Sequence, residues 1–302
     1  MKGSRASARP RSPRPAPARF RRVGLACKCT LKAALSLAEA LEAALESRGL
    51  EVRFDSESAQ ELGRPDGVPR ESLARAVDLV IVIGGDGTLL SVARAAPTST
   101  PVLGVNVGAL GFLAGLSRSE ALSRLDEVLA GEFREDRRLR LSVAVTGGPH
   151  QARFRALNDA VLNKEALARI STFRVELDGR PVAEFRADGV IVATPTGSTA
   201  YNLSAGGPIL HPQLPAVVVT PICPHTLSQR PLVVPADTVI GLRVLDAPTE
   251  GGVYLTLDGQ EGLPIGPECS VEVRPASSAV TLLRPPEADH FRNLAEKLNW
   301  GI

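Results

Sequence analysis

The spacing of hydrophobic residues changes about halfway along the chain. In the first half, aliphatic runs at 22–27, 51–54, 77–83 and 101–106 alternate with stretches of helical period. In one such stretch, residues 31–45, leucine and alanine recur every three or four positions. The run at 77–83 is almost continuously aliphatic, which is typical of a parallel strand covered on both faces. Strands that alternate with helices predict a doubly wound parallel sheet.

After a predicted helix at 119–130, the pattern becomes one of short strands separated by turn residues. Asp-Gly pairs at 178–179 and 258–259 follow two of these strands, and such pairs favour tight hairpins. The second half is therefore predicted to be a β sandwich or a similar stack. Residues 287–300 turn helical again, with an apolar face that can pack back on the first domain. The β-type runs are 141–145, 172–177, 190–193, 216–220 and 253–257.

These patterns predict an α/β protein of two domains, and 302 residues suffice for two separate cores. We expect an N-terminal Rossmann-like parallel-sheet domain over 22–135, to which a C-terminal helix at 286–302 returns. A C-terminal all-β, sandwich-like domain is expected over 136–285. Residues 1–21 consist mainly of Arg, Pro, Ser and Ala, a composition that predicts a disordered extension without the apolar core of a signal peptide.

Charge and cysteine content exclude several classes of function. The chain has 35 Lys and Arg against 33 Asp and Glu, so its net charge of +2 gives no general reason to bind nucleic acid. It has no apolar stretch of about 20 residues, so we expect no membrane span. The four cysteines form no CxxC pair, which fits a reducing cytoplasm. Cys223 and His225 do not complete a tetrahedral zinc site, and no metal site is predicted.

The sequence Gly-Gly-Asp-Gly-Thr at 84–88 directly follows the aliphatic strand at 77–83 and precedes a helical segment. Ligands of open α/β sheets bind beyond the carboxyl ends of the strands, and glycines let a backbone approach a phosphate closely. Asp86 would repel phosphates unless it holds Mg²⁺ or orients and deprotonates a hydroxyl. The structural alternative is a tight turn with an aspartate N-cap. The predicted phosphate loop comprises Gly84, Gly85, Gly87 and Thr88.

A long run of glycine and hydroxyl residues at 194–208 is the second candidate for ligand binding. Such a run offers hydrogen bonds along an extended ligand, and Tyr201 offers a flat surface for stacking on a ring. The chain has no GxxxxGK[ST] motif, and its first strand lacks GxGxxG, which disfavours a Walker P-loop and a standard Rossmann dehydrogenase. A Gly-Gly-Asp-Gly loop occurs in several kinase families, so alone it does not identify the substrate.

From about residue 23 to residue 300, the chain resembles the NAD kinase family. The resemblance implies transfer of a phosphoryl group from ATP, bound with Mg²⁺, to the adenosine ribose 2′-hydroxyl of NAD⁺, giving NADP⁺ and ADP. It also implies a homodimer or homotetramer. The motifs that carry it, in chain order, are 84–88, 106–113, 157–159, 186–189, 194–208, 221–227, 258–260 and the tail with Phe291 and Trp300.

By this resemblance, Asp86 is the catalytic carboxylate that accepts the proton of the 2′-hydroxyl. Asp159 stands where the family usually has a glutamate, so its reach is shorter by one methylene. Asp188 would bind the nicotinamide end, with Arg186 and Arg169 near the phosphates or ribose. The implied NAD-binding residues are Asp86, Gly87, Asn158, Asp159, Arg169, Arg186, Asp188, Thr199, Ala200, Tyr201, Asn202, Leu203, Ser204 and Gln260.

Two other functions share some of these features. A diacylglycerol-type lipid kinase would use the same glycine loop, but it would carry a membrane-facing surface and lack the 194–208 signature. A non-catalytic NAD sensor would have no need of a carboxylate beside phosphates. The range of phosphate donors (ATP, other triphosphates or polyphosphate) and the choice between NAD and NADH stay open at this point.

Overall fold

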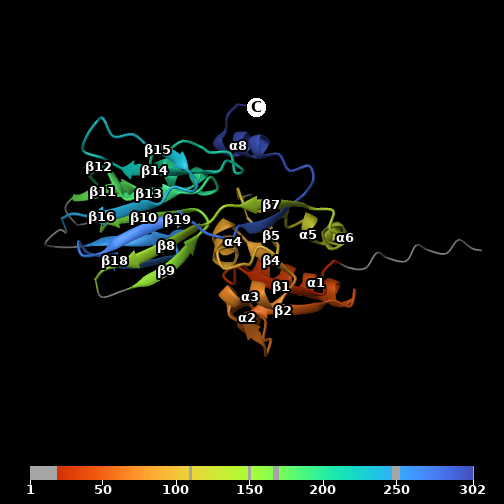
Figure 1. Ribbon diagram of the computed structural model, residues 1–302. Helices are drawn as coiled ribbons and strands as arrows, with labels where there is room; N and C mark the ends of the chain where they lie inside the picture. The colour runs from red at the N-terminus through yellow and green to blue at the C-terminus, as the bar shows by residue number, and fades with distance from the viewer. Residues whose placement is uncertain (1–18, 109–110, 149–150, 166–169, 247–251, 302) are drawn as a thin grey trace, which may run out of the picture.

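The computed structural model describes residues 19–108, 111–148, 151–165, 170–246 and 252–301. An α/β domain and an all-β domain lie side by side, and the last helix, α8 (His290–Leu298), lies above their junction (Figure 1). The predicted fold class, a parallel-sheet domain followed by a β sandwich and a returning helix, is confirmed. None of the helices in the described ranges is long and apolar enough to cross a membrane.

The first domain is built on an eight-stranded sheet whose central strands are parallel. Its order is β3 (Gly67–Val68), β2 (Glu51–Asp55), β1 (Arg22–Cys27), β4 (Leu79–Gly84), β5 (Val102–Asn106), β20 (Val280–Arg284) and β7 (Arg134–Arg138), with β6 (Leu116–Ser117) beside β5. Its helices are α1 (Lys32–Glu46), α2 (Ser56–Glu61), α3 (Arg70–Ala76), α4 (Asp86–Ala93), α5 (Glu120–Ser123) and α6 (Leu125–Ala130).

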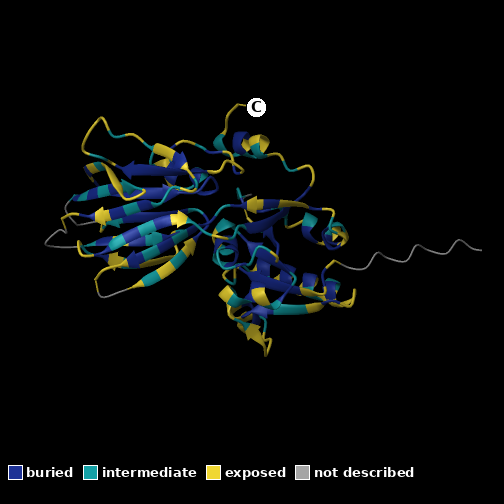
Figure 2. Ribbon diagram, in the orientation of Figure 1, coloured by how far each residue is buried: buried dark blue, intermediate teal, exposed yellow. Residues whose placement is uncertain are grey.

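Helices cover both faces of this sheet, so its central strands are buried throughout (Figure 2). Leu79, Ile81 and Ile83 of β4 pack with α1 and α6, while the alternate residues Val80 and Val82 pack with α3 and α4. This two-sided burial explains the continuous aliphatic run, because side chains of a strand point alternately to opposite faces. The helix predicted at 119–130 forms as two short helices, α5 and α6.

Two antiparallel six-stranded sheets form the second domain, with a core of mostly valine and leucine side chains between them. One sheet has the order β15 (Leu232–Pro235), β14 (Ala216–Ile222), β13 (Gly189–Ala193), β10 (Asp159–Lys164), β17 (Val253–Leu257) and β18 (Glu261–Ile265). The other has β12 (Arg180–Ala187), β11 (Ser171–Leu177), β16 (Ile240–Val244), β19 (Ser270–Pro275), β8 (Leu141–Thr146) and β9 (Ala152–Ala156).

The two Asp-Gly pairs form hairpin turns, as the sequence predicts. Asp178 and Gly179 join β11 to β12, and Asp258 and Gly259 join β17 to β18. All four residues have positive φ angles of 50–75°, which is the conformation of a type I′ turn. The second of these turns faces the first domain, and it carries part of the candidate site.

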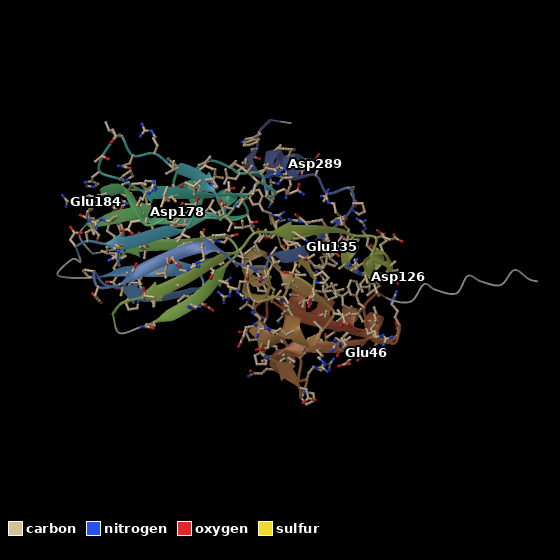
Figure 3. All side chains as sticks on the ribbon, in the orientation of Figure 1. Glu46, Asp126, Glu135, Asp178, Glu184 and Asp289 are labelled. Carbon is tan, nitrogen blue, oxygen red and sulfur yellow. The ribbon has the colours of Figure 1, made fainter. Side chains whose placement is uncertain are left out.

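Two strands of the first sheet, β7 and β20, flank the second domain in the sequence. Strand β7 lies just before the second domain in sequence and β20 just after it, and the two pair antiparallel in the first sheet. Asp289, labelled in Figure 3, is the N-cap of helix α8. Its carboxylate accepts hydrogen bonds from the backbone N–H groups of Phe291 and Arg292. The Lys297 ammonium of this helix lies over the Phe112 ring of the first domain.

At the start of the described chain, Phe20 is only 3% exposed and packs in the core beneath α1. Phe20 is therefore part of the folded domain, although composition assigned it to the extension. Residues 1–18 lie outside the described ranges.

Candidate active site

Asp86 is the first residue of α4, but its carboxylate does not cap that helix. It accepts hydrogen bonds from the backbone N–H groups of Phe112 (2.8 Å) and Leu113 (3.1 Å), in the segment that follows β5. A Cβ atom at Gly111 would overlap the carboxylate, so only glycine lets this segment approach so closely. The structural alternative of an aspartate N-cap is therefore wrong, because the carboxylate is held by a neighbouring segment.

The glycine loop itself leaves open space beside Asp86. Among the described residues, no atom lies within 4 Å of a methyl group placed at Gly85, and Gly87 is exposed. Gly84 is different, because a Cβ there would press on the Thr88 hydroxyl at 2.8 Å. Thus Gly84 allows the turn to close, whereas Gly85 and Gly87 leave room on its outer side.

Gln260, from the second domain, contacts this loop. Its side-chain amide donates a hydrogen bond of 2.6 Å to the carbonyl oxygen of Gly87. The adjacent Glu261 forms an ion pair of 2.6 Å with Arg94, just beyond the end of α4. The β17–β18 hairpin therefore contacts both ends of the segment that begins with Asp86.

Asp258, in the same hairpin, fixes the Asn158–Asp159 pair. Its carboxylate accepts hydrogen bonds from the backbone N–H groups of Leu157, Asn158 and Asp159, the shortest being 2.7 Å from Asn158. In return, the Asp258 N–H donates to the Asp159 carbonyl at 3.0 Å. Asn158 and Asp159 consequently lie beside the turn that carries Gln260.

Asp159 is a buried carboxylate, only 4% exposed. Burial, together with the negative charge of Asp258, raises the pKa of Asp159 to about 7. Burial also raises the pKa of Asp258, in spite of the three N–H groups that favour its ionised form. Near neutral pH, Asp159 can therefore carry a proton and act as a hydrogen-bond donor or acceptor.

The glycine and hydroxyl run at 194–208 packs directly against this pair. The Thr194 hydroxyl donates to the Leu157 carbonyl (2.6 Å), and the Thr194 N–H donates to the Asn158 carbonyl (2.8 Å). A Cβ at Gly197 would collide with the Asn158 carbonyl, so glycine is required for this contact. The run then continues as the 3₁₀ helix η1 (Gly197–Thr199) and the short helix α7 (Tyr201–Ser204).

Within α7, neighbouring residues face in different directions. Tyr201 is 40% exposed. Its pKa is raised, chiefly by partial burial and to a smaller extent by the charges of Cys223, Asp188 and Asp159. Asn202 is fully buried, and its amide bonds the Ser198 and Pro208 carbonyls and the Thr220 hydroxyl. Any ligand contact of Asn202 would therefore involve its backbone. The remaining predicted residues of the run, Thr199, Ala200, Leu203 and Ser204, are half-buried or exposed.

The predicted nicotinamide-side residues lie farther along the second domain. Asp188 connects β12 to β13, and its carboxylate lies 3.6 Å from the Lys164 ammonium. Arg186 is exposed on β12, and its carbonyl accepts a hydrogen bond from the His225 N–H. Arg169 lies outside the described residues. The structure thus groups Asp86, Gly87, Gln260, Asn158 and Asp159, with Tyr201 and Asp188 beyond them and Arg186 at the periphery.

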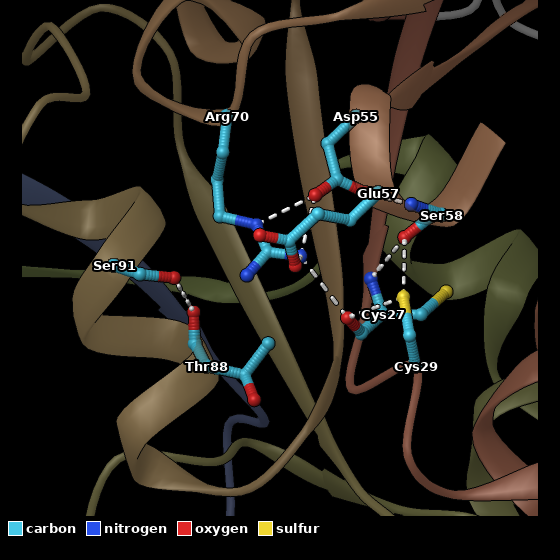
Figure 4. Close-up of polar contacts among 8 residues, drawn as sticks. All are labelled: Cys27, Cys29, Asp55, Glu57, Ser58, Arg70, Thr88 and Ser91. Atoms are coloured by element: carbon cyan, nitrogen blue, oxygen red, sulfur yellow. Dashed lines mark hydrogen bonds and ion pairs between the residues drawn. The ribbon is translucent and has the colours of Figure 1, made fainter. Parts of the chain in front are cut away.

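A second polar cluster lies at the carboxyl ends of β1 and β2, near the start of α4 (Figure 4). The Arg70 guanidinium donates to the Asp55 carboxylate (2.6 Å) and to the Cys27 carbonyl (3.2 Å). The Ser58 hydroxyl accepts a hydrogen bond from the Cys27 N–H, and the Ser91 hydroxyl bonds the Thr88 carbonyl. Sequence reasoning did not single out this cluster, because its members are scattered outside any dense motif.

No group of three or more His, Cys, Asp or Glu side chains in the described ranges is arranged to hold a metal ion. A carboxylate at the end of a parallel strand, on a glycine loop that the second domain contacts through Gln260, suits a nucleotide phosphotransferase, because ligands of such sheets bind beyond the strand ends. The fold and the site thus define the class of protein.

Comparisons with known proteins identify the family. Residues 23–133 match the ATP-NAD kinase N-terminal domain, and residues 157–284 match the ATP-NAD kinase C-terminal domain. The NAD kinase of Syntrophotalea carbinolica is 44% identical over 93% of this chain and 99% of its own, and that of Solibacter usitatus is 45% identical over 85% and 90%. The chain belongs to the ATP-NAD kinase family.

Two solved structures are similar over most of their length. Yeast NADH kinase, crystallised with NADH, has a TM-score of 0.83 and 27% identity, over 93% of this chain and 88% of its own. An NAD kinase from Archaeoglobus fulgidus, in complex with ATP, has a TM-score of 0.74 and 25% identity, over 92% and 98%. The family assignment disfavours the lipid kinase and NAD sensor alternatives.

Proposed function

We propose that this protein transfers the γ-phosphoryl group of ATP to the 2′-hydroxyl of the adenosine ribose of NAD⁺, giving NADP⁺ and ADP. The observation that carries the proposal is the position of the Asp86 carboxylate. Two backbone N–H groups hold it away from its own helix, beside an open loop that the second domain reaches through Gln260. A carboxylate so held can accept a proton from a hydroxyl without first having to reorganise.

In the proposed reaction, the ribose 2′-oxygen forms a bond to the γ-phosphorus, while the bond from that phosphorus to the bridging oxygen of ATP breaks. The hydroxyl proton passes to Asp86, and ADP departs with the electron pair. Mg²⁺ enters as part of the MgATP substrate and neutralises charge on the phosphate oxygens. Because phosphoryl transfer depends mostly on positioning and charge stabilisation, the chief task of the protein is to hold the two substrates in line.

We propose that NAD binds along the loops of the second domain. Asn158 and Asp159 lie beside the hairpin that contacts the Asp86 loop, which suits them to the adenine edge and ribose hydroxyls. Tyr201 supplies a partly exposed ring for stacking, and Asp188 a carboxylate for the nicotinamide end. The shorter Asp159, with its raised pKa, can donate as well as accept a hydrogen bond.

The test is an assay of the purified protein with NAD, ATP and Mg²⁺, in which an NADP-specific dehydrogenase reports the product. NADP formation is expected, whereas diacylglycerol in place of NAD should yield no phosphorylated product. Binding of NAD without turnover would instead show a sensor. Parallel reactions with NADH, other triphosphates and polyphosphate define the acceptor and the donor.

The protein is also proposed to act in the cytoplasm as a homodimer or homotetramer. Exposed apolar side chains, Leu227, Leu232 and Val233, lie in and before β15, an edge strand of the second domain. Such an edge can pair with another copy of the chain. Light scattering on the purified protein should give a mass two or four times that of one chain, and a monomeric mass would contradict the proposed assembly.

A further inference from the structure

Three charged side chains are buried together where the two domains meet. Asp136 and Arg138 come from β7, and Arg284 comes from the adjacent β20. Arg138 donates a hydrogen bond of 2.6 Å to the Asp136 carboxylate, and the Nε atom of Arg284 lies 3.6 Å from the same carboxylate. Although burial disfavours its ionised form, the hydrogen bond from Arg138 and the nearby cations hold the pKa of Asp136 below its usual value.

Arg284 also holds the segment that binds Asp86. Its Nη1 atom donates to the Ala114 carbonyl and its Nη2 atom to the Phe112 carbonyl, each at 2.7 Å. The N–H groups of Phe112 and Leu113, in this same segment, donate to the Asp86 carboxylate. The guanidinium and the carboxylate therefore bind the same short stretch of backbone, one through its carbonyl groups and the other through its N–H groups.

At the other end, the network reaches the proposed dinucleotide-binding loop. The Nη1 atom of Arg138 lies 3.2 Å from the hydroxyl of Thr196, which is itself buried. Thr196 lies between Thr194 and Gly197, the two residues that pack on Asn158. A continuous set of contacts, from Arg284 through Asp136 and Arg138, thus joins the Asp86 side of the site to the NAD side.

Stability alone is a weak explanation for this network. Burying charges costs desolvation energy, and well-packed apolar side chains often serve a fold equally well. Burial and the neighbouring charge of Arg138 lower the pKa of Arg284 to about 10, which leaves it protonated at neutral pH. Unlike an apolar side chain, an arginine provides a planar set of donors, which fixes the geometry of several acceptors at once.

We propose that Arg284 is a positioning residue for phosphoryl transfer. Through the Phe112–Ala114 backbone it orients the Asp86 carboxylate, and through Asp136 and Arg138 it aligns that carboxylate with the loop that carries the dinucleotide. This inference rests on the function proposed above, in which Asp86 receives the proton of the ribose hydroxyl.

The test compares Arg284→Lys with Arg140→Lys, which serves as a matched control. Arg140 is also buried, but it donates to the carbonyls at the end of α4 and at Ser278, away from the segment that binds Asp86. Lysine keeps the charge but cannot reach two carbonyls and a carboxylate together. For Arg284→Lys we expect kcat to fall about 10- to 100-fold with KM for NAD and ATP within about threefold. Arg140→Lys should lower Tm but leave kcat within about threefold.

A double-mutant cycle separates positioning from general destabilisation. If Arg284 acts through Asp86, Arg284→Lys should lower the residual kcat of Asp86→Asn by less than about threefold. Losses that multiply in the double mutant, or a kcat for Arg284→Lys equal to that of the control, would overturn the inference. If Arg284→Lys does not fold, Asp136→Asn takes its place, with the same expected split between kcat and KM.

Failure of this inference is distinguishable from failure of the proposed function. A wild-type protein that makes no NADP would refute the function. A wild-type protein that depends on Asp86, but whose turnover is indifferent to Arg284, would refute only the positioning role.

Discussion

Asp86 illustrates how a single side chain depends on a neighbour with no side chain at all. The carboxylate is held by Phe112 and Leu113, and Gly111 lies against it with no space for a Cβ atom. Backbone N–H groups are well suited to this role, because they cannot rotate away from the carboxylate. The orientation of Asp86 is thus encoded partly in the glycine of another segment.

Gly111→Ala should therefore lower kcat at least 10-fold, because the added methyl group displaces the Asp86 carboxylate from its backbone donors. Steady-state assays of NADP formation measure the effect. Gly252→Ala is the control, since the Tyr254 ring, at 3.9 Å, is the one contact that a Cβ there would make with the described part of the chain. Equal activity of the two variants would show that the placement of the carboxylate does not limit turnover.

The raised pKa of Asp159 predicts how the stability of the protein depends on pH. This pKa is about 7 in the folded protein, against an ordinary value of 3.8. The contribution of Asp159 to stability is therefore fully present below pH 3.8 and is lost as the pH rises through about 7. Relative to Asp159→Asn, the wild type should lose on the order of a few kcal/mol of unfolding free energy between pH 4 and pH 7.5. Urea denaturation at several pH values tests this, and parallel curves for the two proteins would refute the raised pKa.

At this scale the sequence predicts the groups that could do chemistry better than it predicts their supports. Asp86, Asn158 and Gln260 follow from motifs, and the structure brings them together. The supporting groups, Asp258 and Arg284, act through backbone atoms of distant segments. No local pattern reveals such contacts, because the partner atoms are present in every residue.

Among the elements, strands β1 and β4 and helix α1 follow from hydrophobic period, and both Asp-Gly hairpins follow from turn chemistry. Strand β7 does not. Its sequence, Arg-Glu-Asp-Arg-Arg, is entirely charged, yet Asp136 and Arg138 are buried. It becomes a strand because β20, more than 140 residues later in the chain, pairs with it, and single-sequence reasoning cannot anticipate that pairing.

Arg140, between β7 and β8, allows a prediction about the stability of the protein. This fully buried guanidinium donates to the carbonyls of Ala93, Arg94 and Ala96 at the end of α4 and to Ser278 and Ala279 before β20. Arg140→Met should destabilise the protein by at least about 3 kcal/mol, since several buried carbonyls lose their donor. Denaturant unfolding measures this, and a loss below about 1 kcal/mol would show that water replaces the guanidinium.

For the molecule as a whole, the site exists only because two domains are held against each other. The glycine loop belongs to the first domain, and the Asn158–Asp159 pair and Gln260 belong to the second. The sequence predicts both domains and their fold classes, since each has its own hydrophobic period. It does not predict the contact between them, which depends on side chains such as Gln260, Arg94 and Glu261 meeting across the junction.

The central claim is that Asp86 receives the proton of the ribose hydroxyl during phosphoryl transfer. The most direct test measures kcat for wild type and Asp86→Asn, together with the Kd for NAD by calorimetry. Asparagine keeps the shape of the side chain but cannot accept the proton, so kcat should fall about 10²- to 10⁴-fold while Kd stays within about threefold. If Asp86→Asn turns over NAD at a rate close to that of the wild type, the account is contradicted.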